Sequence, residues 1–209
     1  VQDFDRNGGP DILTISGESG DQHVDLYLND GRGNFSRRGD VVPVLDAAYL
    51  SSCDFTNDGA PDLLISGQSY NGSEWVPETY LWKNDGGGHF AETIATLPLR
   101  TNRPIRWADF DQDGWTDLIL QGTIYRNVGG ESLEAAGALP ADAWALAIDD
   151  YSGDGKPDIA LLGNSQTFFL RNAGGFTFET SHTLSGFILY DWNPRAAFWG
   201  DFDADGRLD

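Results

Sequence analysis

The chain has 209 residues, of which 40% are hydrophobic and 12% aromatic, which is enough apolar material for one large domain or two small ones. This composition excludes a disordered acidic tail, in spite of a formal net charge of −20. The sequence has no basic patch and no long apolar run, so we expect neither a nucleic-acid partner nor membrane insertion. One cysteine, Cys53, excludes an internal disulfide framework, and its apolar neighbours indicate a buried, unreactive thiol.

The negative charge is concentrated in five loops that copy, fully or nearly, the phrase Asp-Phe-Asp-x-Asp-Gly-x-x-Asp. We call them loop 1 (residues 3–11), loop 2 (54–62), loop 3 (109–117), loop 4 (150–158) and loop 5 (201–209), and we count positions 1 to 9 within each. The loops hold 17 of the 33 acidic residues, and the remaining 16 acids are nearly balanced by the 13 Lys and Arg of the whole chain. The acidity is local, and that points to metal ions.

The first four loops are each followed by the same succession of strands. A continuous apolar strand comes first, in chain order at 12–17, 63–67, 118–122 and 159–163. A second strand then runs into a turn, in chain order Asn29-Asp30-Gly31, Asn84-Asp85-Gly86, Asn127-Val128-Gly129 and Asn172-Ala173-Gly174. Asn and Gly are expected there to supply the positive φ angles of a hairpin. An aromatic residue or leucine closes each hairpin, at Phe35, Phe90, Leu133 and Phe178.

The repeat predicts an all-β fold, a β-propeller of four-stranded blades. Successive loops start 51, 55, 41 and 51 residues apart, each period holds about four short strands, and no helical periodicity separates them. The chain is then a single partial propeller over 1–209, with repeats at 3–53, 54–108, 109–149 and 150–200 and a fifth that starts at 201–209. Both ends carry the same part of the repeat. We therefore expect an arc of about four blades from a six- to eight-bladed ring, which other chains can complete.

The loops have the chemistry of a calcium site, because calcium takes six to eight oxygen ligands in flexible geometry. Side chains at positions 1, 3 and 5 face one centre, Gly at position 6 permits a sharp reversal, position 7 offers its carbonyl, and Asp at position 9 closes the cage. The predicted ligands are Asp3, Asp5, Asn7, Gly9 and Asp11 in loop 1; Asp54, Thr56, Asp58, Ala60 and Asp62 in loop 2; Asp109, Asp111, Asp113, Trp115 and Asp117 in loop 3; Asp150, Ser152, Asp154, Lys156 and Asp158 in loop 4; and Asp201, Asp203, Asp205, Arg207 and Asp209 in loop 5.

We expect calcium in at least three of these loops. Loops 3 and 5 carry Asp at positions 1, 3, 5 and 9, and loop 1 has Asn7 at position 5. Loops 2 and 4 have the weaker hydroxyl ligands Thr56 and Ser152 at position 3. The predicted order of affinity is therefore loops 3 and 5, then loop 1, then loops 2 and 4.

The loops have two other interpretations, an EF-hand and plain Asp/Gly turns. An EF-hand needs a bidentate Glu at position 12 at the start of a helix, but the first four copies have Thr14, Ile65, Leu120 and Leu161 within apolar strands. The EF-hand is rejected. Plain Asp/Gly turns would explain a single copy. They are a poor explanation of five copies in register, because unpaired carboxylates packed so closely would repel one another.

The loop phrase, followed by the hairpins Asn29 to Phe35 and Asn84 to Phe90, resembles the FG-GAP (VCBS-type) repeat, which builds the calcium-binding propeller of integrin α subunits and of many secreted proteins. The resemblance covers essentially the whole chain. It implies a cage of positions 1, 3, 5, 7 and 9, matched here except at Thr56 and Ser152. Blade three departs from it by a short period and by Glu131-Ser132-Leu133 in place of Gly-x-Phe.

The resemblance implies an extracellular module, secreted or at the cell surface, that binds a protein or a glycan or serves in adhesion. Calcium is then structural, and ligands are expected on the opposite face. The candidate ligand residues are Tyr70, Trp75, Arg103, Trp144, Trp192 and Arg195, since aromatic and Arg side chains anchor interfaces. Trp144 and Trp192 alternatively pack between blades. Two sequons, Asn34-Phe35-Ser36 and Asn71-Gly72-Ser73, are compatible with secretion.

Two alternative functions remain open at this point. The first is the propeller part of a secreted polysaccharide lyase, and the second is an architectural unit of a surface assembly. No catalytic residue is predicted, because the histidines His23, His89 and His182 have no nucleophile or base in recognisable pairing. We therefore expect a binding protein and not an enzyme.

Overall fold

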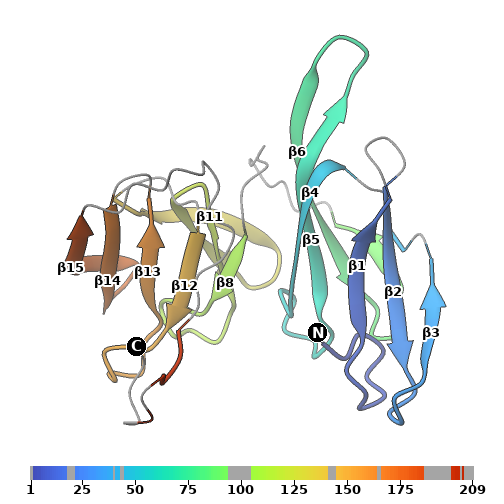
Figure 1. Ribbon diagram of the computed structural model, residues 1–209, viewed down its shortest axis with the longest axis horizontal. Helices are drawn as coiled ribbons and strands as arrows, with labels where there is room; N and C mark the ends of the chain where they lie inside the picture. Colours follow the sequence, from blue (N-terminus) through green and yellow to red (C-terminus); the bar gives the residue numbers. More distant parts are fainter. Residues whose placement is uncertain are drawn as a thin grey trace. The chain divides into compact units, whose positions relative to one another are not determined.

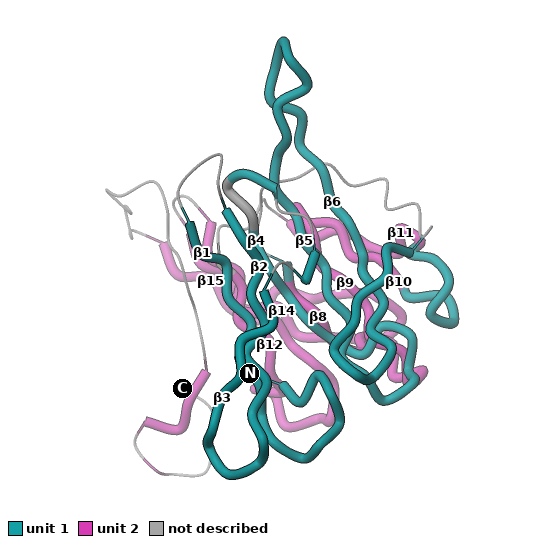
Figure 2. The backbone as a smooth tube through the Cα atoms, turned by 90° about the vertical axis from the view of Figure 1, so that its right-hand side faces the viewer, with its two compact units in different colours: residues 1–105, 127–133 teal, residues 106–126, 134–209 magenta. Residues whose placement is uncertain are grey.

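The computed structural model describes residues 2–17, 22–39, 41–42, 45–93, 105–140, 145–163, 166–185, 199–202 and 204. Over this part of the chain the regular elements are strands, β1 to β15, and no helix is long and apolar enough to cross a membrane. The chain divides into two compact units, which are described separately (Figure 2). Unit 1 comprises residues 1–105 and 127–133, and unit 2 comprises residues 106–126 and 134–209.

The strands form antiparallel sheets in which neighbours in sequence are neighbours in space (Figure 1). The first sheet has the order β1 (Ile12–Ser16), β2 (His23–Asn29), β3 (Phe35–Arg38), and the second the order β4 (Asp46–Cys53), β5 (Asp62–Tyr70), β6 (Trp75–Asn84), β7 (Phe90–Glu92). The third is β8 (Arg106–Ala108), β9 (Asp117–Leu120), β10 (Thr123–Val128), β11 (Ser132–Ala138), and the fourth β12 (Ala145–Asp149), β13 (Asp158–Leu162), β14 (Gln166–Gly174), β15 (Thr177–Ser185). The predicted all-β propeller with about four blades is confirmed.

Each Asp-rich loop connects the first two strands of its blade. β4 ends at Cys53 immediately before loop 2, and β5 begins at Asp62, the last residue of that loop. Loops 3 and 4 stand in the same way between β8 and β9 and between β12 and β13. In the first blade an isolated bridge between Gln2 and Asp11 takes the place of the preceding strand in the described residues.

The third blade is short because its inner turn is tight. Gln121 and Gly122, with φ angles of 52° and 76°, form the two-residue connection between β9 and β10. Its outer hairpin also forms: Gly129 and Gly130 turn the chain with φ angles of 64° and 73°, and Leu133 is buried in the following strand. The departure of Glu131-Ser132-Leu133 from the repeat therefore leaves the β10–β11 pair intact.

The hairpin asparagines do not have the predicted backbone conformation. In these turns positive φ occurs at glycines, such as Gly86 at 81° and Gly174 at 91°, and at Phe176 at 61°, whereas Asn29, Asn84, Asn127 and Asn172 do not adopt it. The asparagines are instead buried. The expectation that Asn shares the left-handed positions with Gly is wrong, because these side chains have hydrogen-bonding partners inside the blade, described below.

Each unit has its own apolar core. In unit 1 the buried cluster is Val24, Val42, Leu45, Leu63 and Ile65. In unit 2 it is Phe110, Ile119, Ile124, Leu139, Leu146, Ile159, Leu161 and Leu170. The predicted burial of Cys53 is confirmed, and burial raises the pKa of its thiol far above the ordinary value.

Candidate metal centres and an aromatic pocket

The first carboxylate of each of loops 1 to 4 shapes the loop backbone. Asp3 accepts hydrogen bonds from the backbone N–H groups of Asn7 at 3.1 Å and Gly8 at 2.8 Å. The same pair of bonds recurs at Asp54, Asp109 and Asp150. The glycines at position 6 have φ angles from 86° to 90°, which confirms the predicted reversal.

Position 4 is also left-handed, and the sequence gives no sign of this. Arg6, Asn57 and Gln112 have φ angles of 56°, 55° and 61°, and Gly153 has 74°. The turn of the backbone sends two of these side chains to the next loop of the same unit. Arg6 reaches Asp58, and the Gln112 amide donates to the carbonyl oxygen of Gly155 at 2.8 Å.

The last carboxylate is buried in loops 1 to 4, and in loops 1, 2 and 4 it joins the loop to the outer hairpin of its blade. Asp11 Oδ1 accepts the backbone N–H of Asn29 at 2.8 Å, and Asp62 and Asp158 accept the corresponding N–H groups of Asn84 and Asn172. Position 9 is therefore structural in its own right. Its carboxylate stabilises the blade whether or not an ion is bound.

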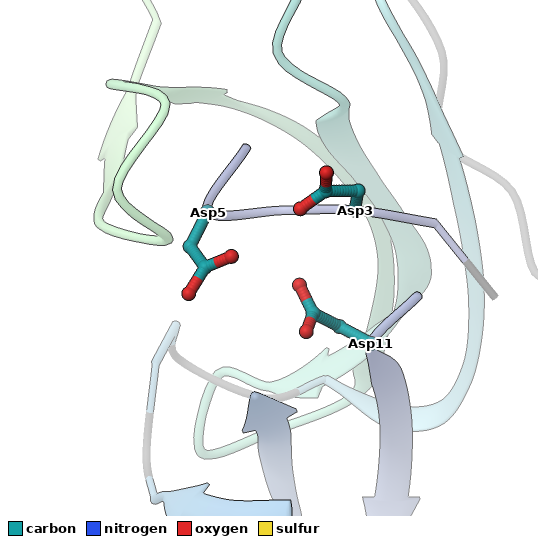
Figure 3. Close-up of side chains that lie close together, drawn as sticks. All are labelled: Asp3, Asp5 and Asp11. Carbon is teal, nitrogen blue, oxygen red and sulfur yellow. The ribbon is translucent and has the colours of Figure 1, made fainter. Parts of the chain in front are cut away.

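Loops 1 and 3 bring three carboxylates together. Asp3, Asp5 and Asp11 each present an oxygen within 4.8 Å of the others, and Figure 3 shows the three groups facing one centre. Asp109, Asp111 and Asp117 form the equivalent group in loop 3. The pKa of Asp5 is raised from its ordinary value by partial burial and by the charges of Asp11 and Asp3, against a lowering hydrogen bond from Asn7. A divalent cation would relieve this repulsion, so both loops fit a metal ion.

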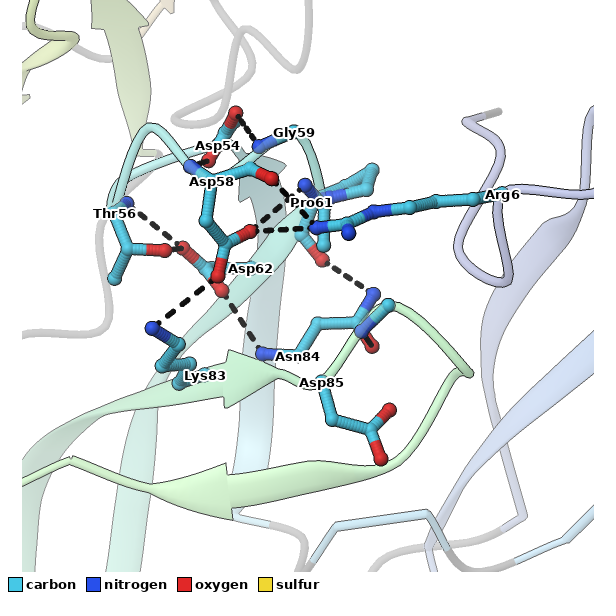
Figure 4. A network of polar contacts seen from close by, with 12 residues as sticks. Arg6, Asp54, Thr56, Asp58, Gly59, Pro61, Asp62, Lys83, Asn84 and Asp85 are labelled. Carbon is cyan, nitrogen blue, oxygen red and sulfur yellow. Dashed lines mark hydrogen bonds and ion pairs between the residues drawn. The ribbon is translucent and has the colours of Figure 1, made fainter.

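Loops 2 and 4 form no such group among the described residues, and positive side chains lie on them instead. In loop 2 the position-5 residue Asp58 forms ion pairs with Arg6 at 2.8 Å and with Lys83 at 3.2 Å (Figure 4). In loop 4 the position-5 residue Asp154 forms ion pairs with Lys156 at 3.3 Å and Arg171 at 3.0 Å.

The pKa values follow these contacts. The hydrogen bond from Arg171 lowers the pKa of the Asp154 carboxyl. For Asp58, burial raises the pKa, but the hydrogen bond from the Ala60 N–H and the hydrogen bond and charge of Lys83 outweigh it, so the net pKa is lowered. Both carboxylates are therefore held ionised by the protein itself.

Loop 3 has features of both kinds. Its acidic group is complete, yet Arg126 forms ion pairs with Asp111 at 3.1 Å and with Asp113 at 2.7 Å. In loop 5 the structure describes Asp201, Phe202 and Ala204, and all three are exposed. The predicted ligands Asp203, Asp205, Arg207 and Asp209 lie outside the described residues.

Position 7 differs between the loops. A Cβ atom on Gly9 would lie 2.8 Å from both Asn29 O and Gly31 N, so loop 1 is closed tightly against its hairpin. Loop 2 accommodates Ala60, fully buried, at the same position. Trp115 and Lys156 occupy it in loops 3 and 4, and each donates its backbone N–H to the position-5 carboxylate.

The hairpin asparagines are functional residues that the sequence interpretation missed. The Asn84 side-chain amide donates to the carbonyl oxygen of Phe4 in loop 1. Asn127 and Asn172 make the same bond, at 2.9 Å each, to the position-2 carbonyls of loops 2 and 3. Their recurrence before Gly is the signal that could have identified them, because a merely conformational role does not require the same residue type in every copy.

A second candidate site lies at the opposite end of the second blade. The β5–β6 hairpin extends beyond the other strands of its sheet (Figure 1) and carries Tyr70 and Trp75, which are 57% and 49% exposed. Their ring centroids are 5.4 Å apart, with an angle of 52° between the rings. They border an open pocket of about 250 Å³, whose lining is Gln22, Leu45, Asp46, Gln68, Ser69, Tyr70 and Trp75.

Four further residues are predicted to contact the ligand. Arg103, Trp144, Trp192 and Arg195 lie outside the described residues. Asp46, Gln68 and Gln22 are lining residues that the sequence did not single out. Asp46 and Gln68 are opposite each other in the β4–β5 register, so strand pairing alone places them side by side.

Four-stranded antiparallel blades, each with an Asp-rich loop between its first two strands, define a β-propeller repeat protein. Loops 1 and 3 add acidic groups that can hold a metal ion. The chain belongs to the FG-GAP-like repeat family, which matches residues 3–65, 54–120 and 150–209.

Among solved structures, the chain is similar to a lectin from Agrocybe aegerita, described for its specific recognition of non-reducing terminal N-acetylglucosamine. The two are 16% identical, the match covers 88% of this chain and 67% of the lectin chain, and the TM-score is 0.38. A search of curated proteins found no match.

Proposed function

We propose that this chain is a calcium-stabilised extracellular binding module, not an enzyme, whose second blade binds a glycan through Tyr70 and Trp75. The observation that carries the proposal is the exposed aromatic pair at the rim of an open pocket. Exposure of large aromatic side chains to water is unfavourable, so a partner that covers these two rings would gain binding free energy.

The chemistry of the pocket favours a glycan over a protein ligand. A pyranose ring has an apolar C–H face that can lie on an aromatic ring and a rim of hydroxyl groups that need hydrogen-bonding partners. Tyr70 and Trp75 offer aromatic rings for the C–H face, and Asp46 and Gln68 offer hydrogen-bonding groups for the hydroxyls. Gln22 also lines the pocket and adds a side-chain amide to its polar groups.

Calcium in this proposal stabilises the fold and does not touch the ligand. Asp62 ends loop 2 at the start of β5, whereas Tyr70 ends the same strand, so the loop and the pocket are at opposite ends of the blade. The acidic groups of loops 1 and 3 are the supported calcium sites, with oxygen ligands alone, as calcium prefers. A bound ion would stabilise the folded state by mass action.

Glycan-array binding of the purified chain tests the ligand. We expect selective binding that Trp75→Ala and Tyr70→Ala each weaken at least about tenfold, because a hot-spot aromatic contributes more than about 1.4 kcal/mol. Phe35→Ala is the matched control: this residue is 47% exposed on the first blade and lies outside the pocket. A folded chain that binds no glycan would contradict the glycan proposal and leave a protein ligand. Release of unsaturated sugars from pectin-like substrates would instead identify a lyase.

Thermal melts with EDTA and with millimolar calcium, together with calorimetric stoichiometry, test the metal. We expect a higher melting temperature with calcium and bound ions that Asp3→Asn and Asp109→Asn remove one by one. A melting temperature that calcium leaves unchanged would contradict calcium stabilisation without affecting the glycan proposal.

A further inference from the structure

We propose that loops 2 and 4 are closed by the protein's own cations in place of a metal ion, so that calcium distinguishes loops that look alike in sequence. This inference deepens the calcium part of the proposed function. It concerns which loops take the ion, and it holds independently of the glycan.

The first carboxylate holds the backbone in the same way in both kinds of loop. Asp54 in loop 2 accepts the N–H groups of Asp58 at 3.0 Å and Gly59 at 2.7 Å, as Asp3 does from the equivalent residues in loop 1. The two kinds of loop differ at position 9, whose Oδ2 accepts the position-2 N–H in loops 1 and 3 but the position-3 N–H in loops 2 and 4. They differ also in the side chains that face the loop.

The position-3 hydroxyl in loop 2 already has a partner within the loop. Thr56 Oγ1 donates to Asp62 Oδ2 at 3.1 Å, and the Thr56 N–H donates to the same oxygen at 3.0 Å. The other oxygen of Asp62 accepts the N–H of Asn84. This hydrogen bond links position 3 directly to the position-9 carboxylate, two positions that a bound metal ion would otherwise link. In loop 4 the Ser152 N–H makes the same bond to Asp158 Oδ2, at 2.9 Å.

The position-5 carboxylate in loop 2 lies between two positive groups (Figure 4). Asp58 Oδ1 accepts from Arg6 Nη2 at 2.8 Å, and Oδ2 pairs with Lys83 Nζ at 3.2 Å. The same Arg6 nitrogen also donates to the Asp58 backbone oxygen at 2.8 Å. Two unit charges thus occupy the side of the loop where a divalent ion would bind, and they would repel it.

Loop 4 has the same arrangement with different residues. The pairing of the position-5 carboxylate with two cations is therefore not peculiar to loop 2. Asp154 pairs with Lys156 from the loop itself and with Arg171 from the outer hairpin. Lys83, Arg126 and Arg171 occupy the same hairpin position, directly before the asparagine, but of these three blades only that of loop 3 faces the cation with Asp at both position 3 and position 5. The first blade has Leu28 at that position and the neutral Asn7 at loop position 5, so loop 1 lacks both members of the pair.

Calcium titration of charge-neutralised variants tests the assignment. Asp54→Asn in loop 2 and Asp150→Asn in loop 4 should leave the number of bound ions unchanged, whereas the matched Asp3→Asn in loop 1 should lower it by one. Loss of one ion in either loop 2 or loop 4 variant would overturn the inference while leaving calcium binding established.

A gain-of-site variant provides the converse experiment. Thr56→Asp combined with Lys83→Leu gives loop 2 the acid at position 3 and the leucine that loop 1 has. We expect one additional bound calcium ion, with a dissociation constant within about tenfold of that of loop 1. A folded variant without an additional ion would contradict the view that these two residues exclude it.

Stability in EDTA gives a measurement that does not depend on any loop binding calcium. Arg6→Leu with Lys83→Leu should lower the melting temperature in EDTA by about 2–4 °C, because Asp58 loses both partners. Arg32→Leu, an exposed substitution in the first hairpin, is the control. An unchanged melting temperature in EDTA would overturn the inference, even if the wild-type chain bound no calcium and that part of the proposed function had failed.

Discussion

The side-chain amide of Asn84 donates a hydrogen bond of 2.8 Å to the carbonyl oxygen of Phe4, 80 residues earlier in the chain. Close by, the Phe4 ring packs edge-to-face against Phe90, with centroids 6.0 Å apart. The outer hairpin of one blade thus holds the Asp-rich loop of the blade before it by one polar and one apolar contact. Asn172 and Phe178 make the same two contacts with Phe110.

Asn84→Ala should lower the free energy of unfolding by about 3 kcal/mol, because several buried polar groups lose their partners together. Besides Phe4, the amide donates to Pro61 O, and its oxygen accepts the N–H groups of Gly86 and Gly88. Urea unfolding measures the change. Asn71→Ala, at the exposed tip of the β5–β6 hairpin, is the control and should cost less than about 1 kcal/mol. An equal loss of unfolding free energy in the two variants would contradict a stabilising role for the buried hydrogen bonds of Asn84.

Arg126→Leu should tighten calcium binding to loop 3 about tenfold, since it removes a positive charge a few ångströms from the site. Leucine is the residue that the first blade has at this hairpin position, so the fold tolerates it. Calorimetric titration of the variant against the wild-type chain gives the affinity, and Arg32→Leu, away from the loops' acidic groups, serves as the control. An unchanged calcium affinity would contradict the prediction and would mean that breaking the ion pairs of Arg126 costs no binding free energy.

Cys53 should be unreactive towards thiol reagents in the folded chain. Burial, and then the charges of Asp62 and Asp54, raise the pKa of its thiol, so almost no thiolate forms near neutral pH. Labelling with a maleimide should proceed only after denaturant is added, and the rate should follow unfolding. Rapid labelling under native conditions would show that β4 opens locally.

Gly9→Ala should destabilise the chain by about 2 kcal/mol, because the new methyl group would overlap backbone atoms of the first hairpin. Gly114→Ala is the informative comparison. Its Cβ would meet nothing within 4 Å, and its cost comes from a φ of +90° alone, about 1 kcal/mol. Thermal unfolding in EDTA separates the two effects from calcium binding. A smaller loss for Gly9→Ala than for Gly114→Ala would contradict the close approach of loop 1 to Asn29.

Much of the fold was accessible from the sequence because its signals are local. The apolar strand after each loop, the glycines at loop position 6 and the glycine turns of the hairpins are set by residues within a few positions of one another, and the repeat multiplies each signal. The structure has these strands, for example at β9 and β13, and the left-handed glycines, for example Gly59. The acidic groups of loops 1 and 3 likewise follow from spacing along one turn of chain.

The sequence by itself determined the class of fold, the phase of the repeat and the set of acidic loops, because these depend on short-range chemistry repeated in register. Only the tertiary structure decided that Arg6 of the first blade pairs with loop 2, and which polar groups join Tyr70 and Trp75. Arg6 reaches Asp58 across 52 residues, and Gln22 meets Gln68 only where separate blades adjoin. Such contacts depend on how one blade packs against the next, and no pattern within a single repeat encodes that packing.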